Sequence, residues 1–234
     1  MIGRVLPTAA TLVVATALLV SCGESRTRST SPSDTSAPPT PVHAPPHVRE
    51  AAQIVPAGPV TSDGRPRRAM LSIPALGLHD LVVVPYGGRT DDAAGTRIQD
   101  RGLAASPYGP RGGVGPGGLG NYQITAHRTS STEAFRRLPS LRVGQVAVVR
   151  AGGLRYVYEI RRTRETSFRS ARSLAEQRAA VPGHPGAPAT RAFLTLSTCA
   201  TLEDHAAGNY WADSLHNPEH RIDKVGVLVQ TAPA

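Results

Sequence analysis

Short apolar runs recur through the part of the chain that follows about residue 67. They are rich in β-branched and aromatic residues and are bounded by glycine, proline and polar residues, which is typical of β-strands. The predicted strands are MLSIPAL (70–76), HDLVVVPY (79–86), NYQITAH (121–127), QVAVVR (145–150), LRYVYEI (154–160), AFLTLST (192–198) and KVGVLVQ (224–230). A glycine-containing turn joins 145–150 to 154–160, which predicts a hairpin. Short strands at such intervals predict a closed or nearly closed β-barrel.

Helical patterns are few. The stretch SARSLAEQRAA (170–180) predicts a helix, and EAFRRL (133–138) predicts one or two helical turns. The glycine-rich stretch PRGGVGPGGLGN (110–121) lacks the Lys-Ser/Thr ending and the strand-to-helix setting of a phosphate-binding loop. It therefore predicts an irregular loop.

The start of the chain has the pattern of an export signal. Arg4 precedes an apolar run at 11–20, and small residues follow; this run is too short for a comfortable membrane span. Leu19-Val20-Ser21-Cys22 resembles a bacterial lipobox, so residues 1–21 are predicted to be a lipoprotein-type signal peptide and Cys22 the lipidated residue. An ordinary signal peptide or short anchor is the alternative.

The next segment differs in composition from the rest of the chain. Residues 22–66 are rich in serine, threonine, proline and alanine and have few apolar residues to bury, so they predict a disordered linker held by the lipid anchor. Residues 67–232 are then one domain's worth of chain. The resulting location is extracytoplasmic, at the cell membrane.

The net charge of +9 comes almost wholly from arginine. Such a surface can attract anionic wall polymers or lipid head groups, although an arginine-rich surface is the simpler explanation. The sequence contains no recognisable nucleic-acid-binding module, so nucleic acid is not an expected partner.

Cysteine chemistry singles out the end of the strand at 192–198. The chain has two cysteines, and if Cys22 carries lipid, Cys199 has no partner within the chain. Such a leftover thiol in an exported protein either pairs with another chain or is reactive. A reactive thiol needs a nearby base or cation and a group that stabilises an oxyanion. His127, at the end of one predicted strand, and Arg221, just before the last, can supply these; alternatively, Cys199 is a small core residue.

These three sites also carry a family resemblance. TLSTC (195–199) resembles the sortase nucleophile signature, ITAHR (124–128) resembles the sortase histidine strand, and HRIDKVGVLV (220–229) resembles the strand that bears the sortase arginine. The resemblance covers about 67–232 and is greatest to the class E branch of actinobacteria. Two departures are Ala126, where glycine is usual, and a long segment between Cys199 and Arg221.

The resemblance implies a mostly β fold, a closed eight-stranded barrel with a few short helices, and a cysteine transpeptidase without cofactor or metal. Cys199 would attack the Thr–Gly carbonyl of an LPxTG-like or LAxTG-like sorting signal, Arg221 would stabilise the oxyanion, and His127 would transfer protons. The partners would be surface proteins bearing that signal and an amine acceptor, commonly a peptidoglycan precursor. Tyr108 would help to select alanine in the signal, and Thr198 would line the substrate pocket.

Three alternatives stay open. His205, His216 and His220 include an H-x3-H spacing that zinc sites use, but no second short-spaced ligand pair accompanies it. An L,D-transpeptidase would need a signature that Ser-Thr-Cys does not match. A catalytically inactive sortase-fold lipoprotein would act as an envelope binding module.

Overall fold

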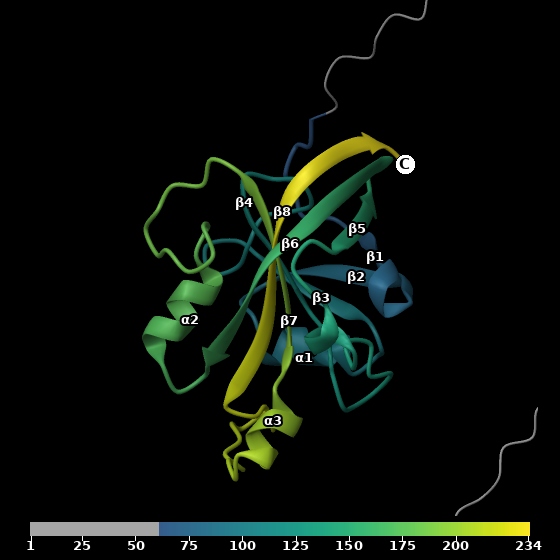
Figure 1. Ribbon diagram of the computed structural model, residues 1–234. Helices are drawn as coiled ribbons and strands as arrows, with labels where there is room; N and C mark the ends of the chain where they lie inside the picture. The colour runs from purple at the N-terminus through teal and green to yellow at the C-terminus, as the bar shows by residue number, and fades with distance from the viewer. Residues whose placement is uncertain (1–60) are drawn as a thin grey trace, which may run out of the picture. The chain divides into compact units, whose positions relative to one another are not determined.

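The computed structural model describes residues 61–234, which form a closed barrel with the strand order β1-β2-β3-β4-β7-β8-β6-β5 (Figure 1). The strands are β1 (Ala69–Ile73), β2 (Leu78–Gly87), β3 (Ala104–Tyr108), β4 (Gly120–Thr125), β5 (Val146–Ala151), β6 (Leu154–Ser167), β7 (Ala192–Cys199) and β8 (His220–Pro233). The predicted fold, a mostly β closed barrel of eight strands, is confirmed. The strand missing from the prediction is β3, whose sequence AASPY has little β propensity.

Three neighbouring strands bring together segments that are distant in the sequence. β4 pairs in parallel with β7, and β7 pairs antiparallel with β8. β8 continues alongside β6, and these two long strands cross the front of the barrel in Figure 1. The end of β4, the end of β7 and the start of β8 therefore meet at the same end of the barrel.

β7 has two different faces. Leu194 and Leu196 point into the barrel and are fully buried in its apolar core. Thr195 and Ser197 alternate with them and therefore face the outside of the barrel, where other segments cover them. A strand that is apolar on one face and polar on the other has its register set by the burial of the apolar face.

Short helices lie between the strands. α2 (Ala171–Arg178) confirms the helix predicted at 170–180; the side chain of Ser170 caps it by accepting from Ser173 N. α1 (Ala93–Gln99) and α3 (Thr201–Ala206) were not predicted. The helix predicted at 133–138 is wrong: turns lead there into the 3₁₀ helix η2 (Leu138–Ser140), and Glu133 has a φ of 51°, outside the right-handed helical region. The glycine-rich loop prediction is confirmed apart from its last two residues, which begin β4.

The predicted signal peptide (1–21), Cys22 and most of the predicted linker (22–66) lie outside the described residues. The described end of that linker contacts the barrel: Gly115 N donates to Gly64 O over 2.8 Å, and the Ser62 hydroxyl donates to Pro116 O. Within residues 61–234, no helix has the length and apolar character that a membrane span requires.

Truncation of the β7 core should destabilise the barrel strongly. Leu196→Ala removes a fully buried side chain and is expected to lower the free energy of unfolding by about 2–5 kcal/mol. Val229→Ala, at a half-exposed position on β8, is the matched control and is expected to change it by less than about 0.5 kcal/mol. Urea denaturation followed by circular dichroism measures both, and equal losses would contradict this assignment of the core.

Candidate active site

Cys199 and Arg221 are direct cross-strand partners. Cys199 is the last residue of β7, and the β7–β8 register places it opposite Arg221, two residues along from the pair Ser197 and Asp223. Directly opposite residues point to the same face, with Cβ atoms about 4.5–5.5 Å apart. The thiol and the guanidinium therefore share the outer face of this edge of the barrel.

His127 reaches the same edge through β4. Thr125, the last residue of β4, pairs with Ser197, so the parallel register continues toward His127 and Cys199 together. Two contacts hold the chain on either side of His127 to the tip of β7. The Thr198 hydroxyl donates to Ala126 O over 2.9 Å, and the Arg128 Nη1 atom donates to Cys199 O over 3.2 Å. The fold thus brings the three predicted catalytic residues to one place.

A carboxylate orients the imidazole. His127 Nε2 lies 2.9 Å from Asp100 Oδ1, at the C-terminal end of α1. A partner on one ring nitrogen selects the tautomer and holds the ring in place. The other nitrogen, Nδ1, is then the one that can exchange a proton with a ligand. Sequence reasoning missed Asp100 because its partner is distant in the sequence.

Arg128 ties the tip of β7 to α3. Its guanidinium is buried and forms a two-pronged ion pair with Glu203, with Nη2 2.8 Å from Oε1. The same guanidinium donates to the carbonyl of Cys199. Arg128 therefore fixes the backbone at the end of β7.

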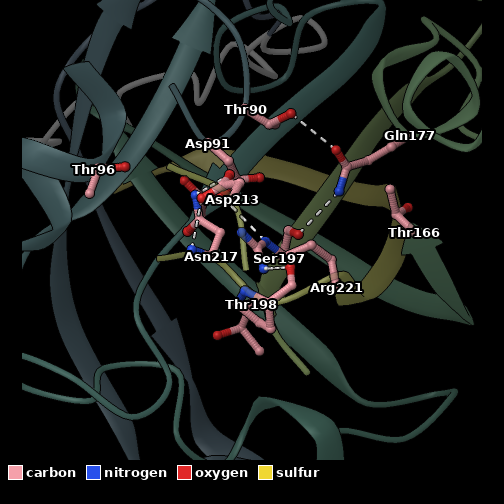
Figure 2. Close-up of polar contacts among 12 residues, drawn as sticks. Thr90, Asp91, Thr96, Thr166, Gln177, Ser197, Thr198, Asp213, Asn217 and Arg221 are labelled. Atoms are coloured by element: carbon pink, nitrogen blue, oxygen red, sulfur yellow. Dashed lines mark hydrogen bonds and ion pairs between the residues drawn. The ribbon is translucent and has the colours of Figure 1, made fainter. Parts of the chain in front are cut away.

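The guanidinium of Arg221 is almost completely buried, with 1% of the residue exposed. It lies over the ring of Phe168, with Cζ 4.3 Å from the ring centroid. Nη1 makes long contacts to Pro218 O (3.5 Å) and His220 O (3.4 Å), and Nε lies 3.5 Å from Asp91 Oδ1. Figure 2 shows Asp91 reaching Arg221 from the loop after β2. Nε and Nη2 are both buried and have no hydrogen-bond partner among the described residues, so the guanidinium keeps unused donor capacity.

The electrostatics of the site keep the resting thiol protonated. Burial raises the pKa of Cys199, the charge of Arg221 lowers it, the carboxylate of Asp91 raises it, and Arg128 lowers it slightly; the pKa ends above its usual value. Burial alone would lower the pKa of Arg221, but Asp91, Cys199 and Asp223 together raise it, so the guanidinium stays charged.

A buried hydrogen-bond network lies beside the thiol. The carboxyl group of Asp223 accepts from the Thr166 hydroxyl (2.6 Å) and from Gln177 Nε2 (3.0 Å), and its burial raises its pKa. Gln177 Nε2 also donates to the Ser197 hydroxyl (3.2 Å), and its Oε1 accepts from the Thr90 hydroxyl (3.0 Å) (Figure 2). This network joins α2, β7 and β8 to the loop that carries Asp91.

An open cavity of about 360 Å³ adjoins Arg221. Asp91 and Phe168, which both contact the guanidinium, are part of its wall. The remaining lining residues are Arg89, Thr90, Asp92, Ala93, Leu174, Arg178, Asp213, Ser214 and Leu215. The mixed charges of this wall suit a polar ligand.

Of the two predicted substrate-binding residues, Thr198 lies next to Cys199 but is buried, and Tyr108 lies away from the thiol. Thr198 is 2% exposed, and its hydroxyl is occupied by Ala126 O. Tyr108 is 39% exposed and lines a different hollow, of about 260 Å³, formed by residues 87–88 and 108–111. Because β3 runs antiparallel to β4 with Ala105 opposite Thr125, Tyr108 lies toward the start of β4 and away from His127. The structure does not bring Tyr108 together with the thiol.

Two of the three histidines considered as metal ligands contact different side chains. His220 Nδ1 lies 2.6 Å from Asp204 Oδ1, and the ring of His205 stacks on Tyr210 with centroids 4.8 Å apart. Within residues 61–234, no three potential metal-ligating side chains come together.

Comparisons with known proteins agree with this arrangement. The family model described as the Sortase domain matches residues 71–213, which contain His127 and Cys199 but end before Arg221. A comparison with curated protein sequences found no match. The chain therefore belongs to the sortase family, whose members are cysteine transpeptidases.

Solved structures of similar fold include three sortases of actinobacteria. SrtA sortase from Actinomyces oris superposes with a TM-score of 0.55 at 20% identity, over 76% of this chain and 89% of that one. Sortase E from Streptomyces avermitilis gives 0.52 at 23% identity, over 74% and 93%. Sortase E1 from Streptomyces coelicolor, solved with a tripeptide in its active site, gives 0.51 at 22% identity, over 74% and 94%. The family match confirms the resemblance to sortases, and these structures, two of them sortases E, share the fold of this chain.

The charge of Arg221 should control the reactivity of the thiol. In Arg221→Met the thiol loses the cation that lowers its pKa, so alkylation of Cys199 by iodoacetamide near pH 8 should slow by about threefold or more, because only the thiolate reacts. Peptide mapping by mass spectrometry measures the rate at Cys199 alone. Arg172→Met, at a highly exposed position, is the control; an equal effect in both variants would contradict a local interaction.

Proposed function

We propose that this sortase is an active transpeptidase in which Cys199, His127 and Arg221 are the catalytic residues. The observation that carries the proposal is the cross-strand pairing of Cys199 with Arg221 at the edge where β4 delivers His127. A nucleophile, a proton carrier and an oxyanion-stabilising cation then lie on one face. These are the three groups that acyl transfer by a thiol requires.

The chemistry follows from these positions. The Cys199 thiolate attacks the carbonyl carbon of the scissile Thr–Gly bond, and the unpartnered Nη2 of Arg221 stabilises the oxyanion that forms. The C–N bond then breaks, and His127 gives a proton to the departing glycine amine. An incoming amine attacks the thioester, its proton passes to His127, and the C–S bond breaks to release the thiolate, so the product contains a new amide bond.

Asp100 supports this proton transfer. Its carboxylate holds Nε2 of His127, which keeps the ring in one orientation while the proton moves at the other nitrogen. The raised pKa of Cys199 means that only a small fraction of resting enzyme carries the thiolate. A low rate of turnover is the expected consequence.

The substrate is proposed to be a surface protein with an LAxTG-like or LPxTG-like sorting signal, as class E membership implies. Similarity to sortase E structures supports that class. Tyr108 remains the candidate for recognising the residue that follows leucine, although this requires the signal to extend along β4 to the hollow beside β3. The buried Thr198 contributes by fixing β7 to β4.

The proposed setting is the outside of the cell membrane. Residues 1–21 would direct export, Cys22 would be lipidated, and residues 22–66 would span the distance to the catalytic domain at 67–232. The acceptor amine would come from a peptidoglycan precursor or a similar envelope molecule. Sortases in general act on sorting signals and amine acceptors, which supports this setting.

An acyl-enzyme test decides the activity. Incubation with LAxTG and LPxTG peptides should add the mass of the N-terminal fragment to Cys199, and Cys199→Ala should abolish both adduct and cleavage. Cys22→Ala is the matched control and should retain the adduct. Binding of peptide without any adduct in the unmodified protein would instead support an inactive sortase-fold binding module.

His127 should act on proton transfer rather than on folding. His127→Gln is expected to lower cleavage of the preferred peptide by about 100-fold or more, because general acid–base catalysis contributes roughly that factor. The melting temperature should change little, since the imidazole is partly exposed. A variant that cleaves at the wild-type rate would exclude His127 from catalysis.

A further inference from the structure

Asp91 is an acidic residue buried against the cation of the active site. Its side chain is 6% exposed, and Oδ1 lies 3.5 Å from Nε of Arg221. The other oxygen, Oδ2, is buried without a hydrogen-bond partner among the described residues. A buried carboxylate is costly unless a charge balances it, so the contact with Arg221 accounts for the presence of Asp91 at this place.

Arg221 needs such a partner. Its backbone carbonyl contacts are long, and the ring of Phe168 supplies only a weaker cation–π attraction. The other nearby carboxyl, Asp223, is occupied by Thr166 and Gln177. Asp91 is thus the acidic group that contacts the guanidinium within the described part of the chain.

The loop that carries Asp91 is held in place on both sides. Thr90 bonds to Gln177, and Arg178 donates to both the hydroxyl and the carbonyl of Thr90. On the other side, Asp92 caps α1 by accepting from Gly95 N over 2.9 Å. Asp91 itself has a φ of 60°, in the left-handed region that asparagine, aspartate and glycine tolerate best. This conformation directs the side chain toward Arg221 (Figure 2).

We propose that Asp91 is a positioning residue of the active site: its carboxylate holds the Nε edge of Arg221, so that the guanidinium lies on Phe168 with Nη2 free for the oxyanion. This inference rests on the proposed function, because the oxyanion role of Arg221 belongs to it. Asp91 touches neither the thiol nor the scissile bond and acts through Arg221.

The same charge opposes formation of the thiolate. Several charged or titratable groups surround Cys199, and they come from four segments of the chain. They are Arg221 and Asp223 on β8, His127 and Arg128 after β4, Asp91 after β2, and Glu203 on α3. Among the carboxylates, Asp91 is the one whose charge raises the pKa of the thiol. Asp91 therefore has two opposing effects. It holds the guanidinium of Arg221 in place, and it raises the pKa of Cys199, which lowers the fraction of thiolate.

The first test compares Asp91→Asn with Asp92→Asn. Both remove one negative charge, and asparagine suits the φ of Asp91 and the helix cap at Asp92. In Asp91→Asn the pH profile of Cys199 alkylation should move to lower pH, with a rate near pH 8 about threefold or more above wild type. Asp92→Asn should keep the wild-type profile. Coincident profiles for Asp91→Asn and wild type, or equal shifts in both variants, would overturn the inference.

The second test uses Asp91→Gly, which keeps the backbone conformation and removes the acceptor. With the preferred signal peptide, Asp91→Gly should lower kcat about tenfold with little change in KM, as loss of transition-state stabilisation predicts. Asp91→Asn should retain most of kcat, because its amide oxygen occupies the place of Oδ1, which lies 3.5 Å from Nε in the unmodified protein. Wild-type kcat in Asp91→Gly would contradict a positioning role.

A third measurement separates this inference from the proposed function. In urea denaturation, Asp91→Gly should destabilise the wild-type protein more than it destabilises Arg221→Met, because the lost contact is absent from that background. This result needs no turnover and no peptide. Failure to cleave any signal peptide would end the proposed function alone, whereas additive destabilisation would end the role of Asp91 alone.

Discussion

The register between β7 and β8 is the constraint on which the active site depends. Side chains alternate between the two faces of a strand, so a slip of one residue would turn Cys199 into the barrel and Leu196 outward. Burial of Leu194 and Leu196 prevents that slip. The apolar residues of β7 thereby determine that Cys199 and Arg221 share the outer face. The placement of Cys199 opposite Arg221 is therefore a consequence of core packing.

Buried charge is the second constraint. Arg221 is 1% exposed, so few water molecules would weaken its interaction with the proposed oxyanion, but the same burial demands a compensating carboxylate. Asp91 supplies it, and its charge also acts on the thiol. The site therefore combines a well-positioned, permanently charged arginine with a thiol that is mostly protonated at rest. Such a thiol is less readily oxidised, because oxidation follows thiolate character.

Membership of the sortase family and the three-dimensional arrangement contribute different information. The family match covers His127 and Cys199 and stops before β8. Arg221 enters the site through strand pairing instead. The structures of similar fold share less than a quarter of their residues with this chain, so they describe the barrel, and the chemistry is argued from the chain's own contacts.

The sequence by itself determined the barrel class, seven of the eight strands and the three catalytic candidates, because alternating apolar patterns and short motifs are local properties. It did not reveal β3, whose AASPY sequence forms a strand only through pairing with β2 and β4. Asp91 and Asp100 also went unrecognised, since neither stands in a motif and each acquires its role from a partner distant in the sequence. Tertiary structure alone decided which carboxylates meet the Arg221 guanidinium and the His127 imidazole, because only folding brings these loops to the end of the barrel formed by β4, β7 and β8.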